Sequence, residues 1–399
     1  MAKAHVKNHT FITLFTFVYI YTATIDFFTN SLWMLLLQHS FYNVQILLKM
    51  VSFRIATDED NLKLIQLAAS SAMAGNIGLR IDRHPDFFAL LKMRGDTKVF
   101  VAEENNIIIG AICVSQQKVY VGGEIYPLQY IGDFKVADTY RNQGIGLKLC
   151  NEMADYVISH NSDLAFLNVS MGNSKPVSFF KNRPNVPDFD NIGIFKIYQI
   201  IGKRMKPAIH KYSVEETLFN DDVLQFFNRH NSNYQLGTVI TAEKFSAANI
   251  FIIRKGEKII AAMSLMDTMP VKQNVITALS WKLKLVLKLI NAFSSLSGLS
   301  RMPVLNEPVK MLYIKYLAVE PNHIHLVKFL INYARNIAFE KSYSYVSIGL
   351  HEKDRFNDCL SGLPKLTFKS VGMLLSIKNN RALIKKVKDG VPYEDYSTV

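Results

Sequence analysis

The feature that most constrains this chain is the six-residue segment Arg141-Asn142-Gln143-Gly144-Ile145-Gly146. It follows a strand-like run of residues 128–136 and opens a helix-like run of residues 147–157. A turn at the start of a helix leaves backbone N–H groups unpaired at the positive end of the helix dipole, where phosphate binds well. The glycines permit close approach and a positive φ, and Arg141 adds a cation. The segment therefore predicts a phosphate-binding loop.

Two common phosphate motifs do not fit this loop. A dinucleotide fingerprint needs a third glycine where Leu149 stands, and a mononucleotide P-loop needs Gly-Lys-Ser/Thr where the chain has Gly146-Leu147-Lys148. What remains is a strand, then Arg-x-x-Gly-x-Gly, then an amphipathic helix. This arrangement resembles the coenzyme A signature of the GNAT superfamily of N-acetyltransferases.

The segments around the loop strengthen the resemblance. Before it we expect a short strand, a capped helix from about Asp58, two further helical stretches to about Leu91, and three strands. The first two of these strands form a hairpin around Asn105-Asn106, and the third turns at Gly122-Gly123. After the loop helix come strands at 164–169 and 192–200. These elements follow the superfamily's order over residues 50–205. The strands before the loop are expected at 53–56, 99–104, 107–114 and 118–121.

The resemblance implies direct transfer of an acetyl group from acetyl-CoA to an amine. In the family, the strand before the loop offers backbone groups to the thioester and the pantetheine arm, the loop N–H groups hold the pyrophosphate, and an asparagine further on touches coenzyme A. Here the strand residues that would contact the thioester and the pantetheine arm are Phe134, Lys135 and Val136. The loop residues that would hold the pyrophosphate are Asn142, Gln143, Gly144, Ile145 and Gly146, with Arg141 at the entrance. The asparagine that would touch coenzyme A is Asn173.

Phe180 departs from the family pattern. It stands where the family often has a tyrosine that protonates the departing thiolate, and phenylalanine has no proton to give. Another group or solvent then supplies the proton, or transfer is slow.

An amine acceptor must also lose a proton, so a base is needed within reach or through one water. Asp133, Glu124 and Tyr130 are candidates because they lie on or beside the strand that leads to the loop. Asp133 and Lys135 alternate with Phe134, so they are expected on the opposite face of the strand, where they could pair with each other.

The second half repeats the outline of the first. A hairpin of residues 250–254 and 259–263 turns at Gly256, and a strand at 310–319, a helix at 326–339 and a strand at 343–349 follow. The turn at 320–325 has neither Gly-x-Gly nor arginine, so it cannot bind a phosphate in the same way.

The fold class predicted is α/β, with two GNAT-like domains in tandem, each a twisted mixed sheet flanked by helices. Residues 50–205 would be the acetyl-CoA-binding domain, and residues 206–399 a degenerate GNAT-like domain with an insertion at 268–306. Within that insertion, residues 281–293 form a helix-like run in which Lys284 and Lys288 share one side. This helix could be a lid over an acceptor pocket, a surface helix that touches a membrane, or a helix packed on its own domain.

Residues 1–49 form a hydrophobic leader. Its apolar run at 11–23 is shorter than the ~20 residues that cross a bilayer. Because Met50 directly precedes the predicted domain, we interpret the leader as a misassigned translation start, with a membrane anchor as the alternative.

Charge and composition narrow the partners. Residues 206–399 hold 26 Lys and Arg against 16 Asp and Glu, a net +10, which favours an acidic partner or simply solubility. No RNA-binding module stands out, so no nucleic acid is expected. Three cysteines without paired spacing indicate reduced thiols of a cytoplasmic protein. His323 and His325 lack a third ligand, so no metal is expected.

The sequence therefore predicts an N-acyltransferase that moves an acetyl group from acetyl-CoA to a primary amine of a small molecule or peptide. It would act as a monomer or a homodimer. The alternative is a non-catalytic module that binds coenzyme A or an acidic partner, favoured by Phe180 and by the second half without a loop motif.

Overall fold

The structure, a computed structural model, describes residues 51–70, 77–160, 162–171, 188–205, 212–245 and 248–399. Residues 53–141 and 145–399 form one compact unit. The other unit consists of residues 1–52 and 142–144, of which 51, 52 and 142–144 are described. The predicted leader, Asn173 and Phe180 lie outside the described residues.

Strands alternate with helices along both halves of the chain. The elements of the first half are β1 (Ser52–Ile55), α2 (Asn61–Ala69), β2 (Ile77–Asp82), α3 (Phe87–Arg94), β3 (Asp96–Glu104), β4 (Ile107–Val121), β5 (Glu124–Val136), α4 (Ile145–Ser159), β6 (Leu164–Ser170) and β7 (Asp190–Ile201). Those of the second half are β8 (Glu215–Thr217), α6 (Asp221–Asn231), β9 (Gly237–Thr238), β10 (Ala248–Lys255), β11 (Lys258–Asp267), β12 (Gln273–Leu279), α7 (Trp281–Ser297), β13 (Met311–Val319), α8 (His325–Glu340), β14 (Tyr345–His351), α9 (Phe356–Cys359), β15 (Lys365–Ser376) and α10 (Arg381–Asp389).

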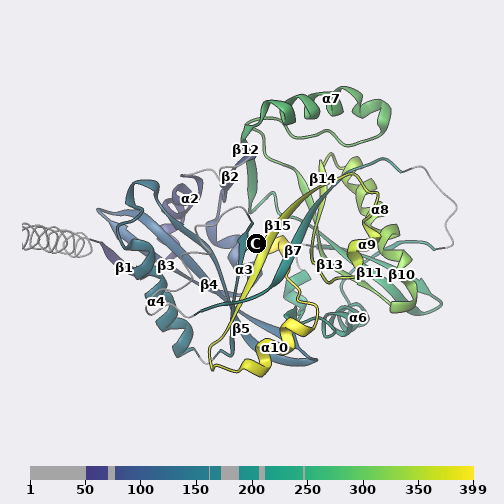
Figure 1. Ribbon diagram of the computed structural model, residues 1–399. Coiled ribbons are helices and arrows are strands. Elements are labelled where there is room, and N and C mark those ends of the chain that lie inside the picture. The colour runs from purple at the N-terminus through teal and green to yellow at the C-terminus, as the bar shows by residue number, and fades with distance from the viewer. Residues whose placement is uncertain (1–50, 71–76, 161, 172–187, 206–211, 246–247) are drawn as a thin grey trace, which may run out of the picture. The chain divides into compact units, whose positions relative to one another are not determined.

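Among the described residues, thirteen strands form one mixed sheet, in the order β1-β3-β4-β5-β6-β15-β7-β14-β13-β11-β10-β8, with β9 paired to β4 (Figure 1). The two halves exchange their last strands. β15, from the end of the chain, lies antiparallel between β6 and β7, and β7 pairs on its other side with β14. The mixed α/β fold predicted from the sequence is therefore found, with the sheets of the two halves joined into one.

Helices cover both faces of the sheet in the first half. Ala111 and Cys113 of β4 pack in one core cluster with Leu64 of α2 and Leu91 of α3. A Cβ added to Gly110 would instead meet a side-chain methyl of Leu149 in α4 at 2.9 Å. Because neighbouring residues of a strand point to opposite faces, α2 and α3 lie on one face and α4 on the other.

The second half has the same layering. Ala262 of β11 packs with Phe227 of α6, whereas the next residue towards the N-terminus, Ala261, packs with Leu330 of α8. The helix that follows the central strand, α4 or α8, thus covers the same relative face in each half, as expected for tandem domains of one fold.

Two predicted hairpin turns are confirmed by their backbone angles. Asn105 and Asn106 both have positive φ, 49° and 65°, as a two-residue hairpin turn requires, and Gly256 has a φ of 59°. Where the sequence suggested separate strands at 107–114 and 118–121, the structure has one strand, β4, paired with β5 from Gly110 to Val121.

One predicted helical stretch is wrong. Residues 77–82 form the strand β2, which pairs antiparallel with β12 of the insertion, nearly 200 positions away in the sequence. Helical periodicity within a short run cannot reveal such a partner, because pairing over that distance is set by tertiary structure.

We expect Gly372→Val to destabilise the exchanged strand. A Cβ at Gly372 would lie 2.6 Å from Phe195 Cε2 and 3.0 Å from Ile192 Cγ1. Overpacking of this kind costs about 1–3 kcal/mol of unfolding free energy. Urea denaturation should show the loss, whereas Thr367→Val, at an exposed position of the same strand, should change little. Equal stability of both variants would contradict this account of the strand.

Candidate active site

Strand β5 separates from β6 where it approaches the predicted loop. The two strands pair in parallel from Leu128 to Ile131 and no further. Just beyond, β5 carries a bulge: Gly132 lies opposite Cys113 and Lys135 opposite Ala111, so two residues of β5 face one of β4. The end of β5, which includes the predicted cofactor residues Phe134, Lys135 and Val136, is thus directed away from β6.

The predicted phosphate loop leads directly into α4, which begins at Ile145. Gly144 has a φ of 81°, the left-handed conformation expected from glycine. Asn142 also has a positive φ, 64°, which asparagine tolerates better than most residues. Gly146, in contrast, lies inside the first turn of α4. Of the two glycines, Gly144 therefore supplies the unusual backbone angle and Gly146 only a small side chain.

Arg141 is held by a weak partner. Its Nη2 lies 2.6 Å from Asp138 Oδ1, and both side chains are largely exposed. Exposed ion pairs contribute at most about 1 kcal/mol. A phosphate could therefore replace Asp138 as the partner of Arg141 at little cost.

Asp133 lies in a buried ionic cluster at the bulge. Its two carboxylate oxygens lie 2.5 Å from Arg83 Nη2 and 3.1 Å from Arg94 Nη1, and both arginine side chains are almost fully buried. Burial favours the neutral acid, but the charges of Arg83 and Arg94 outweigh it and hold the pKa of Asp133 below its ordinary value. Such a carboxylate is a poor proton acceptor at neutral pH.

The expected pairing of Asp133 with Lys135 is wrong. Asp133 has a φ of 51°, so the bulge breaks the strict alternation of side chains on which that expectation rested. Lys135 Nζ instead donates to the carbonyl oxygen of Ala68 at the end of α2.

Comparison with protein families agrees with this geometry. The family model described as acetyltransferase (GNAT) family matches residues 63–183, a span that contains β5, the loop and α4. Residues 63–183 form a GNAT acetyltransferase domain.

Solved structures resemble the chain well beyond the GNAT domain. Saccharomyces cerevisiae N-myristoyltransferase with bound myristoyl-CoA matches with a TM-score of 0.57 and 12% identity over 82% of this chain and 79% of that chain. A second structure of that protein with myristoyl-CoA matches with a TM-score of 0.56 and 10% identity over 82% of each chain. A GCN5-related N-acetyltransferase from Anabaena variabilis matches with a TM-score of 0.47 and 10% identity, over 82% of this chain and 73% of that chain. No curated protein sequence matches. At these identities the two N-myristoyltransferase structures show a shared fold.

The other two candidate bases predicted from the sequence, Tyr130 and Glu124, lie at different places along β5. Tyr130 lies three residues before the bulge, with the Arg94 guanidinium 4.8 Å from its ring centroid. Burial, assisted by the charge of Glu394, raises the pKa of Tyr130 well above its ordinary value, so it stays protonated. Glu124 is exposed at the opposite end of β5, nine residues or about 30 Å from Asp133, and is too distant to act at the bulge.

Glu394 is a candidate base that sequence reasoning missed. Its carboxylate accepts a hydrogen bond from Asn168 of β6, one residue beyond the last residue that pairs with β5. Burial raises the pKa of Glu394 to about 7, although hydrogen bonds from Asn168, Tyr396 and Tyr130 favour the charged form. A base with a pKa near the working pH is well suited to proton transfer. Glu394 thus lies where β5 and β6 separate, in a state that can accept a proton.

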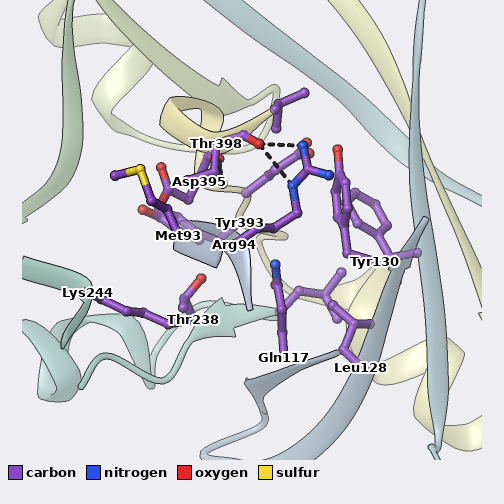
Figure 2. A pocket seen from close by; sticks show the side chains of 14 residues that line it. Met93, Arg94, Gln117, Leu128, Tyr130, Thr238, Lys244, Tyr393, Asp395 and Thr398 are labelled. Atoms are coloured by element: carbon purple, nitrogen blue, oxygen red, sulfur yellow. Dashed lines mark hydrogen bonds between the residues drawn. The ribbon is translucent and has the colours of Figure 1, made fainter. Parts of the chain in front are cut away.

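A small cavity adjoins Glu394. It has a volume of about 30 Å³, enough for one or two water molecules. Figure 2 shows Tyr130 and Arg94 on one side of it, with Arg94 donating to the carbonyl oxygen of Thr398 at 2.9 and 2.5 Å. The cavity gives Glu394 room for a proton relay through water.

Lys272, which precedes β12, is a further titratable group near the bulge. Burial and the charge of Arg83 lower its pKa to about 7, against the opposing effect of Asp133. Its Nζ donates to the backbone oxygen of Val399. No signal in the sequence marks Lys272 or Glu394, because both reach the GNAT domain from the second half.

The second half keeps the strand geometry of the site but not its loop. β13 and β14 pair only from Met311 to Tyr313, and a bulge at Lys315 follows. At the end of β13 lies a cavity of about 560 Å³. Its lining is charged and aromatic rather than glycine-rich, and includes Phe226, Arg229, His230, Tyr234, Lys353 and Arg355 together with Glu320 and Asp354. The counterpart of the phosphate-binding loop is therefore a cavity between side chains.

Two negative findings apply to the described part of the chain. It contains no helix long and apolar enough to cross a membrane. In the same residues, no three His, Cys, Asp or Glu side chains gather in a way that could hold a metal ion.

We expect Asp133→Asn to destabilise the protein by about 3–5 kcal/mol, because it leaves two buried arginines without their counter-charge. The folded pKa of Asp133 lies below its unfolded value, so its contribution is complete above pH ~4 and is lost as the pH falls toward the folded pKa. Denaturant titrations at several pH values should show a smaller acid-induced loss in the variant. Asp138→Asn, which breaks the exposed pair, serves as control. A comparable loss in the control would contradict the importance of burial.

Proposed function

We propose that this GNAT-fold acyltransferase transfers an acetyl group from acetyl-CoA directly to a primary amine of a small molecule or peptide. The observation that carries the proposal is the sequence of features along one segment. A strand bulges, leaves its parallel neighbour, and leads through a turn with left-handed Asn142 and Gly144 into α4. Separation of the strands makes room for a thioester arm, and the helix start favours its pyrophosphate.

The cofactor contacts follow from this placement. We assign the thioester and pantetheine arm to the backbone of Phe134, Lys135 and Val136. We assign the pyrophosphate to the N–H groups of residues 142–146 and to Arg141, whose present partner is exposed and weak. Asn173 is retained as a further contact on the basis of the family resemblance.

Glu394 is the base that the geometry favours. The acceptor amine attacks the thioester carbonyl, a C–N bond forms and the C–S bond breaks. The amine gives its proton to the Glu394 carboxylate, directly or through a water in the adjoining cavity. The coenzyme A thiolate takes a proton from solvent or from the same relay, since Phe180 cannot supply one. Asp133 then acts as a positioning residue that fixes the bulge through Arg83 and Arg94.

We expect Gly144→Trp to weaken acetyl-CoA binding by about tenfold or more, because a bulky side chain occupies the turn. Gly123→Trp is the matched control, since Gly123 also has a positive φ, 85°, and open space around its Cβ. Calorimetric titration of acetyl-CoA, with myristoyl-CoA in parallel, measures both variants. Unchanged binding by Gly144→Trp would refute the role of the phosphate-binding loop. Tighter binding of myristoyl-CoA than of acetyl-CoA would mean that the protein carries a longer acyl group.

We expect kcat/KM for an amine acceptor to fall as the pH drops below about 7, because Glu394 must be deprotonated to act. Glu394→Gln should retain acetyl-CoA binding, lose this acid limb, and reduce kcat by about 10²–10⁴-fold. Glu340→Gln, at an exposed position at the end of α8, should behave like the unmodified protein. An acid limb that persists in Glu394→Gln would assign the base elsewhere. Binding without turnover of any amine would favour the non-catalytic alternative.

A further inference from the structure

Helix α7, in the insertion, presents two apolar faces. Its inner face is accounted for: Leu287 is buried, and Leu283 and Ile290 are partly buried in a core cluster that includes Met302 and Tyr345. The side chain of Asn291, also on this side, bonds to the backbone of Met302. These contacts hold α7 on the protein by one face only.

The outer face of α7 is apolar and exposed. Trp281 is 72% exposed, Leu285 51%, Leu289 52% and Phe293 59%, and these residues recur every four positions, with Leu296 at 87% beyond them. At 3.6 residues per turn they form one stripe along the helix, opposite Leu287. We call these five residues the outer stripe. A contiguous exposed apolar surface of this kind marks an interaction site.

The charge on α7 identifies the kind of partner. Lys282, Lys284 and Lys288 lie beside the outer stripe, and the helix contains neither aspartate nor glutamate. At helical spacing, Lys284 and Lys288 fall on one flank of the stripe and Lys282 on the other. Two copies of α7 packed stripe to stripe would bring like charges together, whereas an anionic surface would meet lysine on both flanks.

We propose that α7 docks flat on an anionic lipid surface, with the outer stripe among the acyl chains and headgroups and the lysines on lipid phosphates. An amphipathic helix with Trp, Phe and Leu on one face and lysines at its borders is suited to this position. Its 17 residues span about 25 Å. The ring centroid of Trp281 lies 5.6 Å from Lys282 Nζ, so docking would place the indole ring beside a lysine at the membrane–water interface, where tryptophan is favoured. In Figure 1, α7 follows β12 away from the main sheet.

Trp281 itself reports on this docking. The chain has two tryptophans, Trp33 and Trp281, so the full-length Trp33→Phe variant has one. We expect its emission to shift to shorter wavelength with phosphatidylcholine vesicles that contain phosphatidylserine. The shift should weaken with added salt and be much smaller with phosphatidylcholine alone.

Matched variants test the outer stripe. Leu285→Glu with Leu289→Glu, made in the Trp33→Phe background, should abolish the shift and vesicle co-sedimentation through α7. Leu62→Glu with Leu218→Glu adds the same charge at leucines that are 62% and 87% exposed elsewhere, and should leave the shift intact.

Three results would overturn the proposal. One is vesicle binding without a change in Trp281 emission, which would assign the contact to another segment. Another is a shift that survives in the Leu285→Glu, Leu289→Glu variant. The third is a shift that appears without lipid as protein concentration rises, which would make a second copy of the chain the occupant. Acetyl-CoA binding is a separate readout, so failure here leaves the proposed function untouched.

Discussion

The exchange of strands between the two halves is the constraint on which the candidate site depends. β15 pairs with both β6 and β7, so the end of the chain must return to the GNAT domain before the sheet is continuous. That return brings the final residues of the chain to the bulge of β5, where Arg94, a partner of Asp133, donates to Thr398, 304 positions away. Glu394 reaches the gap between β5 and β6 by the same route. A GNAT domain cut from this chain would therefore lose both a strand and its candidate base.

The buried charges at the bulge contribute more to the position of the β5 backbone than to the stability of the fold. Two arginines and one carboxylate lose their hydration on burial, and their attraction repays little more than that cost. What they do hold is the geometry, because Asp133, with its backbone in the left-handed conformation, pairs with Arg83 and Arg94 together. The bulge, the ion pairs and the departure of β5 from β6 thus form one interdependent arrangement.

Local signals account for what the sequence could predict. The turns at Asn105-Asn106 and Gly256, the loop before α4 and the helix α8 depend on residues close together in the chain, so their composition is informative. Distant partners account for what it missed. β2 is a strand because β12 pairs with it, and Asp133 turns toward two arginines because a bulge interrupts alternation. Glu394 and Lys272 join the site only in the folded chain, and burial is the largest of the causes that bring the pKa of each to about 7.

The pairing of β2 with β12 also has a mechanical consequence. At one end of this two-stranded ribbon, Asp82 lies opposite Gln273, and the adjoining residues are Arg83 and Lys272 of the ionic cluster. At the other end, about 20 Å away, β12 leads into α7. The ribbon thus connects a surface helix at one end with the charges around Asp133 at the other. A force that tilts α7 would therefore reach the candidate site at the bulge through paired backbone rather than through a loop.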